Sequence, residues 1–251
     1  MFKSRLLEAA GFPLHGFTQR GGGVSEGELS SLNLSWDREP SAERVVENLR
    51  RVRTAIGARD PLARVRQVHG SDVIDAADLL AGGYDGWKQM PEREADAIVV
   101  AGTKALAGIL TADCAAVLLA DPSTRSVAAV HAGWRGAAKG VIKRAVRAIS
   151  DRGATPSRLV AAIGPAICGR CYEVGEEVER RFPESSEEIA NSPGKYLLDL
   201  PNAVEVSLIG AGLTTANIER IDVCTACHPE LLFSHRASGG KCGHQLGFVS
   251  P

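Results

Sequence analysis

The stretch SVAAVHAGWRG, residues 126–136, shows most clearly how this chain folds. Its first half, residues 126–130, is short, apolar and β-branched, which predicts a buried strand. After Gly133 the spacing of apolar residues becomes helical, with basic residues on the opposite face. The chain thus predicts a strand, a tight glycine turn and a helix, with free N–H groups near His131 and Arg135 where a phosphate or carboxylate could bind. The helical stripe consists of Ala138, Val141, Ile142, Ala145, Val146 and Ile149.

Further elements follow from the same periodicities. Between Ser41 and Gly57, apolar residues recur on one helical face, with Ser41 suited to cap the start and Gly57 the end. Helices are also predicted over residues 175–182 and 201–210, the latter with proline near its start. Short buried strands are predicted over residues 64–68, 97–100, 108–110, 115–120, 160–163 and 221–224. The order is too irregular for a repeated βαβ unit, and no glycine-rich dinucleotide fingerprint follows any strand.

Composition limits the function classes. No stretch of the 251 residues resembles a linker, so one domain is expected over residues 1–251. Acidic and basic residues are interspersed and the net charge is −1, which favours neither a nucleic-acid partner nor a membrane surface. No apolar run has the length of a signal peptide or a membrane span. We therefore expect a cytoplasmic protein with a small-molecule ligand.

Three apolar runs end on residues that bind metals. They are RQVHG with His69, LTADC with Cys114, and VHAGWRG with His131. Two imidazoles and one thiolate suit a zinc ion whose fourth position stays open for water or substrate. Each signal is weak alone, because a histidine at a strand end is commonly structural and a buried cysteine commonly inert. Strands that lie side by side would bring the three residues to one rim, with Asp113 next to Cys114.

The same phrases carry a family resemblance. Together with IGPAI (163–167), CYEVG (171–175) and FSHR (233–236), they resemble the laccase-domain family, also called multicopper polyphenol oxidase-like or purine nucleoside phosphorylase-type, which includes proteins named peptidoglycan editing factor. The resemblance extends from about Gly16 to Gly247. It implies that His69, Cys114 and His131 bind a single zinc ion.

The resemblance also implies a fold and an activity. The implied fold is a single α+β domain layered helix, sheet, sheet, helix, similar to the catalytic domain of cytotoxic necrotising factor. The implied activity is phosphorolysis of adenosine, inosine and methylthioadenosine, with adenosine deaminase as a second activity. A zinc ion fits the deaminase reaction, since it lowers the pKa of bound water towards about 7. The expected partners are a purine nucleoside and phosphate.

Roles for the neighbouring residues are hypotheses. Asp113 would orient a ligand or move a proton, and Arg135 with the turn amides would hold phosphate. Asp113 could equally be a turn residue, and Arg135 a solvated helix end. Asn33, Gln67 and Tyr172 could line the substrate pocket or serve as structural hydrogen-bonding groups.

Other functions remain open. A multicopper oxidase normally needs His-x-His pairs, and this chain has six histidines and no such pair, so polyphenol oxidase activity would require copper in the zinc site. Cys114 could instead be the nucleophile of an amidase or hydrolase that edits cell-wall precursors, with His131 or His69 as base and Asp113 nearby. A zinc-bearing binding protein without turnover is a further alternative.

Three features lie outside this scheme. Cys168-x-x-Cys171 and Cys224-x-x-Cys227 have the spacing of a structural zinc site, but the family needs none, so ordinary thiols are expected, with Cys242 as a bystander. Gly243-His244 and His235-Arg236-Ala237 replace arginine-containing phrases of relatives, which leaves the role of His244 and the preferred nucleoside open. The sequence does not determine the oligomeric state.

Overall fold

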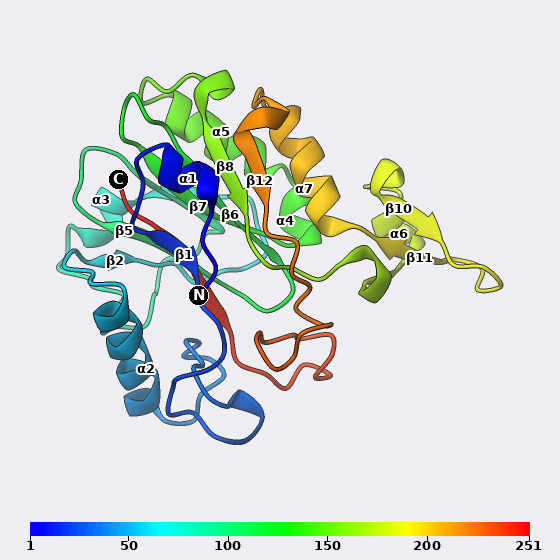
Figure 1. Ribbon diagram of the computed structural model, residues 1–251, viewed down its shortest axis with the longest axis horizontal. Helices are drawn as coiled ribbons and strands as arrows, with labels where there is room; N and C mark the ends of the chain where they lie inside the picture. The colour runs from blue at the N-terminus through cyan, green and yellow to red at the C-terminus, as the bar shows by residue number, and fades with distance from the viewer.

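Two β-sheets face each other and carry helices on their outer surfaces (Figure 1). The computed structural model describes residues 1–251. Its α-helices are α1 (Arg5–Ala9), α2 (Ala42–Ala55), α3 (Ala76–Leu80), α4 (Trp134–Ala138), α5 (Val141–Ser150), α6 (Glu176–Glu179) and α7 (Leu200–Ile209). Single turns of 3-10 helix lie at Gly27–Leu29, Pro156–Arg158, Gly169–Cys171, Pro183–Ser185 and Thr215–Asn217.

The strands form three sheets. They are β1 (His15–Phe17), β2 (Leu62–Ala63), β3 (Val73–Asp75), β4 (Ala97–Val100), β5 (Leu106–Thr111), β6 (Ala115–Ala120), β7 (Val127–Ala132), β8 (Val160–Ile163), β9 (Glu173–Gly175), β10 (Ser186–Glu188), β11 (Lys195–Leu198), β12 (Ile218–Arg220) and β13 (Gln245–Val249). The six-stranded sheet has the order β12-β8-β6-β7-β4-β3, and the four-stranded sheet has the order β1-β13-β5-β2. A three-stranded sheet, β10-β11-β9, projects with α6 to one side (Figure 1).

The six-stranded sheet is buried on both faces. Along β6, Val117 and Leu119 pack with the apolar stripe of α5, whereas Ala116 and Leu118 pack towards the four-stranded sheet. Successive strand residues point to opposite faces, so a strand covered on both sides needs an uninterrupted apolar run. This explains why residues 115–120 show no polar alternation.

Helix α2 covers the outer face of the four-stranded sheet. Val45, Leu49 and Val52 on one helical face share a core with residues of β5 and β13, including Leu106 and Phe248. The side chain of Ser41 accepts a hydrogen bond from the Arg44 N–H and caps the helix. The predicted helix between Ser41 and Gly57 is confirmed.

Several other predicted elements are correct. The strands predicted over residues 97–100, 115–120 and 160–163 coincide with β4, β6 and β8. Those predicted over residues 108–110 and 126–130 lie within or overlap β5 and β7, and the helix predicted over 201–210 is α7, shifted by one residue. These segments are long or strongly apolar, which is where periodicity is most informative.

Four predicted elements are wrong in extent. The helix expected over residues 138–149 is two helices, because Gly140 has φ 82° and separates α4 from α5. Residues 64–68 contain only an isolated bridge from Arg66 to Glu94. The strand expected over 221–224 lies earlier, as β12, and residues 175–182 contain only the four-residue α6. For the two strands, tertiary pairing rather than local composition determines the boundary.

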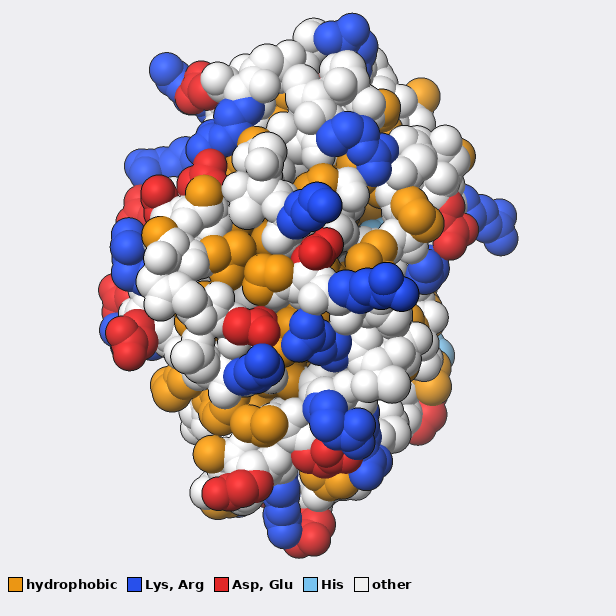
Figure 2. Space-filling view, turned by 90° about the vertical axis from the view of Figure 1, so that its left-hand side faces the viewer, with side chains coloured by type: hydrophobic (Ala, Val, Ile, Leu, Met, Phe, Trp, Pro, Cys, Tyr) orange, Lys and Arg blue, Asp and Glu red, His pale blue; other side chains and the backbone are white.

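Charges are mixed on the molecular surface. Figure 2 shows basic and acidic side chains side by side over the face it draws, consistent with the net charge of −1. None of the helices is long and apolar enough to cross a bilayer.

Candidate metal centre

Strand pairing brings two of the predicted ligands together. Cys114 immediately precedes β6, and His131 lies near the end of β7. The two strands are antiparallel, with Ala116 paired to His131, so the start of β6 and the end of β7 lie at one edge of the sheet. His69 approaches the same edge from the loop between β2 and β3.

The ligand atoms of His69, Cys114 and His131 all lie within 4.8 Å of one another. The two imidazole rings meet edge to face, with ring centroids 4.9 Å apart. His131 is buried, Cys114 is half-buried and His69 is exposed, so the cluster is closed on the protein side and accessible on the other. Two imidazoles and a thiolate in this arrangement could hold a metal ion with a position left for a reactant.

Asp96 supports the cluster, and sequence reasoning missed it. This fully buried carboxylate accepts a hydrogen bond of 2.7 Å from His131 Nδ1, which leaves Nε2 available to a metal. It also accepts from the backbone N–H groups of Val68, His69 and Gly70 at 3.2, 3.0 and 2.6 Å. One side chain therefore orients both histidines. The sequence signal was an acidic residue directly before the apolar strand 97–100.

The three groups also shift one another's titration. Burial disfavours the Cys114 thiolate, but the positive charge of His131 and hydrogen bonds from His131 and His69 outweigh it and lower the pKa of Cys114 to about 6. Burial likewise disfavours the His131 imidazolium, but the Cys114 thiolate and the hydrogen bond to Asp96 raise the pKa of His131 to about 9. Cys114 is therefore a ready thiolate ligand near neutral pH.

The backbone around the cluster is specialised. Asp113 and His69 have φ values of 97° and 56°, in the left-handed region that side chains other than glycine rarely adopt. A Cβ at Gly133 would lie 2.7 Å from Cys114 Sγ, so only glycine lets β7 turn this close to the sulfur. Strain of this kind concentrates at functional sites.

A cavity of about 660 Å³ opens beside the cluster. Its lining includes three polar atoms that are buried and lack any hydrogen-bond partner: Arg64 Nη1, Trp36 Nε1 and His244 Nδ1. Burial, followed by the positive charge of Arg38, lowers the pKa of His244 to about 3, so this imidazole is neutral. Arg64 is 3 % exposed, and its Nη2 donates to the Leu34 carbonyl at 3.2 Å while Nη1 has no partner. Unsatisfied buried groups are costly, so these three atoms are suited to pair with polar groups that enter the cavity.

Two of the predicted pocket residues serve mainly as structural groups. Gln67 lines the cavity, but its side-chain amide is paired at both ends with the backbone of Leu110, at 2.7 Å each. Asn33 is fully buried and is not part of the lining. Its Oδ1 accepts from the backbone N–H groups of Ser35 and His244. Of the two roles expected for Asn33, these contacts are those of a structural hydrogen-bonding group, which holds the His244 loop.

Asp113, Arg135 and Tyr172 all line the cavity. Asp113 accepts hydrogen bonds from Thr225 Oγ1 at 2.6 Å and from the Arg236 backbone N–H at 2.7 Å, so both carboxylate oxygens are occupied. Arg135 is exposed and stacks on Trp134, with its Cζ 4.4 Å from the ring centroid. Burial raises the pKa of Tyr172 to about 12, so its hydroxyl remains protonated.

The chain matches the family described as multi-copper polyphenol oxidoreductase laccase over residues 14–251. It belongs to this family, whose laccase-like architecture combines sheets and helices in one domain. The predicted family resemblance is confirmed, and so is the coarser prediction of a mixed α/β fold.

Named relatives are similar along nearly their whole length. A purine nucleoside phosphorylase of Deinococcus radiodurans is 38 % identical over 97 % of this chain and 94 % of its own. The crystal structure of YlmD from Geobacillus stearothermophilus superimposes with a TM-score of 0.84 and 31 % identity, covering 95 % of this chain and 93 % of its own. The Bacillus licheniformis protein YfiH gives a TM-score of 0.87 at 27 % identity, over 94 % and 91 % of the two chains.

Proposed function

We propose that this chain is a zinc-dependent purine nucleoside phosphorylase with adenosine deaminase as a second activity, acting on adenosine, inosine and methylthioadenosine. The observation that carries the proposal is the His69, Cys114 and His131 cluster at the wall of a polar cavity. The name of the Deinococcus radiodurans relative supports the substrate class. We further propose one domain over residues 1–251, layered helix, sheet, sheet, helix like the cytotoxic necrotising factor catalytic domain, since α2 and α5 cover opposite outer faces.

Zinc fits the donor set better than a multicopper centre. Of the six histidines, His15 is buried against Ser4 and Phe12, and His228 is exposed beside Glu230. The cavity therefore offers two histidines beyond the cluster, His235 and His244, and neither lies close enough to the cluster to share its metal ion. A trinuclear copper cluster needs many more. Copper could still replace zinc among the same three ligands, and polyphenol oxidation would then be a consequence of that exchange.

When bound, the metal would supply Lewis acidity and a lowered pKa for water at its open position. The protein's own residues would bind and orient the reactants. In phosphorolysis a phosphate oxygen bonds to the anomeric carbon, the N-glycosidic bond breaks, and the base leaves with the electron pair and takes up a proton. In deamination water adds to the purine carbon, and ammonia leaves.

We assign phosphate to the arginine side of the cavity. Arg64 offers a buried and unpaired guanidinium N–H, and a buried charge of this kind is stabilised by an anion. Arg135 and Arg236 lie at the exposed rim and would complete the recognition. Asp113 would act as a positioning residue, because it holds the Arg236 backbone. His244, neutral and with a free Nδ1, could contact the base or sugar.

The test uses protein of known metal content incubated with adenosine, with and without phosphate, and separate measurement of adenine and inosine. Adenine that forms only with phosphate supports the phosphorylase. Inosine that forms regardless of phosphate supports the deaminase. If neither product forms with metal-loaded protein, the proposal fails and the reading as a zinc-bearing binding protein gains support.

One observation favours a second candidate, a cysteine-based amidase or hydrolase that edits cell-wall precursors. Cys114, His131 and Asp96 form a chain of nucleophile, base and orienting carboxylate, with Asp96 in the place we expected for Asp113. The two candidates differ in their need for His69. Zinc requires this residue, whereas the nucleophilic chain does not.

His69→Gln therefore separates the two candidates. The zinc enzyme loses the zinc ion of this centre, and nucleoside turnover with it, in this variant. The hydrolase keeps its activity in this variant. The hydrolase also predicts that Cys114 of the untreated wild-type protein can be alkylated. His235→Gln is the matched control, since His235 lines the cavity outside the cluster and its loss should leave metal content unchanged.

A further inference from the structure

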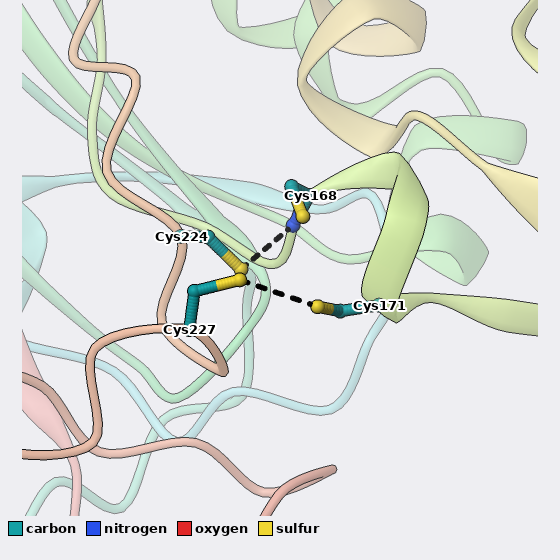
Figure 3. Close-up of side chains that lie close together, drawn as sticks. All are labelled: Cys168, Cys171, Cys224 and Cys227. Carbon is teal, nitrogen blue, oxygen red and sulfur yellow. Dashed lines mark hydrogen bonds between the residues drawn. The ribbon is translucent and has the colours of Figure 1, made fainter.

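Four cysteines form a second cluster away from the centre described above. Cys168 directly precedes, and Cys171 ends, the 3-10 turn that follows β8, and Cys224 and Cys227 lie in the loop that follows β12 (Figure 3). Their sulfur atoms all lie within 4.8 Å of one another. None of them belongs to a disulfide.

The fold itself brings the two pairs together. Strands β8 and β12 are parallel neighbours, with Ala161 paired to Ile218, so the chain leaves both at the same edge of the sheet. A further bridge between Ala166 and Cys224 continues this pairing beyond the strands. The two Cys-x-x-Cys turns therefore face each other as a consequence of sheet order, and their sulfurs point towards one common space (Figure 3).

The geometry of the sulfurs is that of a thiolate metal site. A tetrahedral zinc ion with Zn–S bonds of about 2.3 Å places its sulfurs about 3.8 Å apart. The sulfurs of Cys171 and Cys227 are 3.4 Å apart. The Cys168 backbone N–H lies 3.3 Å from Cys224 Sγ and donates to it, as expected where the sulfur is a negatively charged ligand.

We propose that Cys168, Cys171, Cys224 and Cys227 bind a second zinc ion, a structural one with all four positions taken by protein. This reverses our expectation of ordinary thiols, which rested on the family's having no need of a second site. With four protein ligands such a site has no place for a reactant. Its effect is to join the β8 turn to the β12 loop, which lie 56 residues apart along the chain.

Both joined segments reach the cavity of the first centre. Tyr172 directly follows Cys171 and lines the cavity. Thr225 lies between Cys224 and Cys227, is fully buried, and donates its hydroxyl to Asp113. The second zinc would thus fix two parts of the cavity wall. This consequence, unlike the metal site itself, rests on the proposed function.

Metal counting tests the site without any activity measurement. Protein purified without chelators should carry about two zinc ions per chain, and Cys171→Ser/Cys227→Ser and His69→Gln should each carry about one. Combining all three substitutions should leave none. Cys242→Ala is the matched control, because Cys242 is buried outside both clusters and its loss should leave about two. Equal zinc in the wild type and in the double cysteine variant would overturn the proposal.

Cobalt distinguishes the two sites by their ligands. Thiolate-to-cobalt charge-transfer absorption increases with the number of thiolates, and the proposed site has four where the first centre has one. Cobalt-loaded His69→Gln should therefore keep most of the wild-type absorption, and Cys171→Ser/Cys227→Ser should lose most of it. The reverse pattern would refute the assignment.

Alkylation of the wild type keeps the proposal testable if the cysteine variant fails to fold. The four cysteines should resist iodoacetamide in native protein and become reactive when a chelator removes zinc, as read by peptide mass mapping. Exposed Cys227 makes this test stringent, because a free thiol there would react at once. Reaction without zinc release, disulfides in freshly purified protein, or iron in place of zinc would each overturn the proposal. Failure of nucleoside turnover would leave these results untouched.

Discussion

Replacing Asp96 by Asn should weaken metal binding more than any other substitution that leaves the three ligands in place. Asp96 Oδ1 accepts from His131 Nδ1 and the His69 N–H, and Oδ2 accepts from the N–H groups of Val68 and Gly70. An amide converts one oxygen into a donor, so whichever way it is oriented, two donors lose their acceptor.

The size of the effect follows from these contacts. Losing the carboxylate partner of a metal-bound histidine costs about 10–100-fold in metal affinity, which is about 1.4–2.7 kcal/mol. Two orphaned donors in a buried setting cost about 1–3 kcal/mol each in the metal-free protein. We expect the dissociation constant for zinc to rise about 10–100-fold, and the metal-free variant to unfold at lower urea concentration.

The assay is competition for zinc against a chromogenic chelator, paired with urea unfolding with and without metal. Asp72→Asn is the matched control, since Asp72 lies in the loop that carries His69 and its backbone carbonyl accepts from the Asp96 N–H, but its side chain is exposed and pairs with Arg144. The control should retain wild-type affinity. A folded Asp96→Asn protein that binds zinc as tightly as the wild type would refute the role assigned to Asp96.

Three further outcomes are expected. Gly133→Ala should reduce the zinc content, because its Cβ would lie 2.7 Å from Cys114 Sγ. Gly175→Ala is the control and should leave the zinc content unchanged, since its Cβ would meet nothing within 4 Å. Zinc analysis of both proteins decides. Arg64→Met should raise the KM for phosphate several-fold or more in steady-state kinetics. It should change urea stability by less than about 1 kcal/mol, since it removes a buried charge that forms no ion pair. An unchanged KM would show that phosphate does not bind at Arg64. In metal-free protein the thiolate of Cys114 should form near pH 6, because its pKa is about 6 rather than 9.0. The measurement is the difference in ultraviolet absorbance between the wild type and Cys114→Ser as the pH is varied. The lowered pKa of Cys114 stabilises the folded protein. This contribution to stability is lost as pH falls through about 6, and the His131 imidazolium that lowers the pKa of Cys114 is itself lost above about pH 9. Urea stability of the metal-free wild type relative to Cys114→Ser should therefore be greatest between about pH 6 and 9 and should fall as the pH drops through about 6.

The sequence predicted the interior of the fold better than its edges. Strands β4, β6 and β8 were found because a strand covered on both faces has an uninterrupted apolar run. The residues at 221–224 were misassigned because their apolar character serves a loop that carries Cys224 and Thr225. Gly140 broke a helix whose apolar stripe continues on both sides, which periodicity cannot detect.

At the site, sequence reasoning found the three ligand candidates but not their support. His69, Cys114 and His131 were recognisable because each ends an apolar run and each is a metal-binding residue type. Asp96 gave no comparable signal, since an acidic residue before a strand is common at turns. Arg64 was also missed, because nothing in the sequence shows that it is buried without an ion pair.

The missing information is the order of strands along one edge of the six-stranded sheet. In the order β12-β8-β6-β7-β4, the strands present at that edge Cys224, Cys168, Cys114, His131 and Asp96 respectively. Hydrogen bonds from the Ile167 N–H to the Asp113 carbonyl and from the His131 N–H to the Asp96 carbonyl continue the pairing there. Because neighbouring strands fix the spacing of these residues, both clusters depend on the same sheet register. A substitution that shifts that register would therefore disturb both metal sites at once, whereas removal of one set of ligands should leave the other intact.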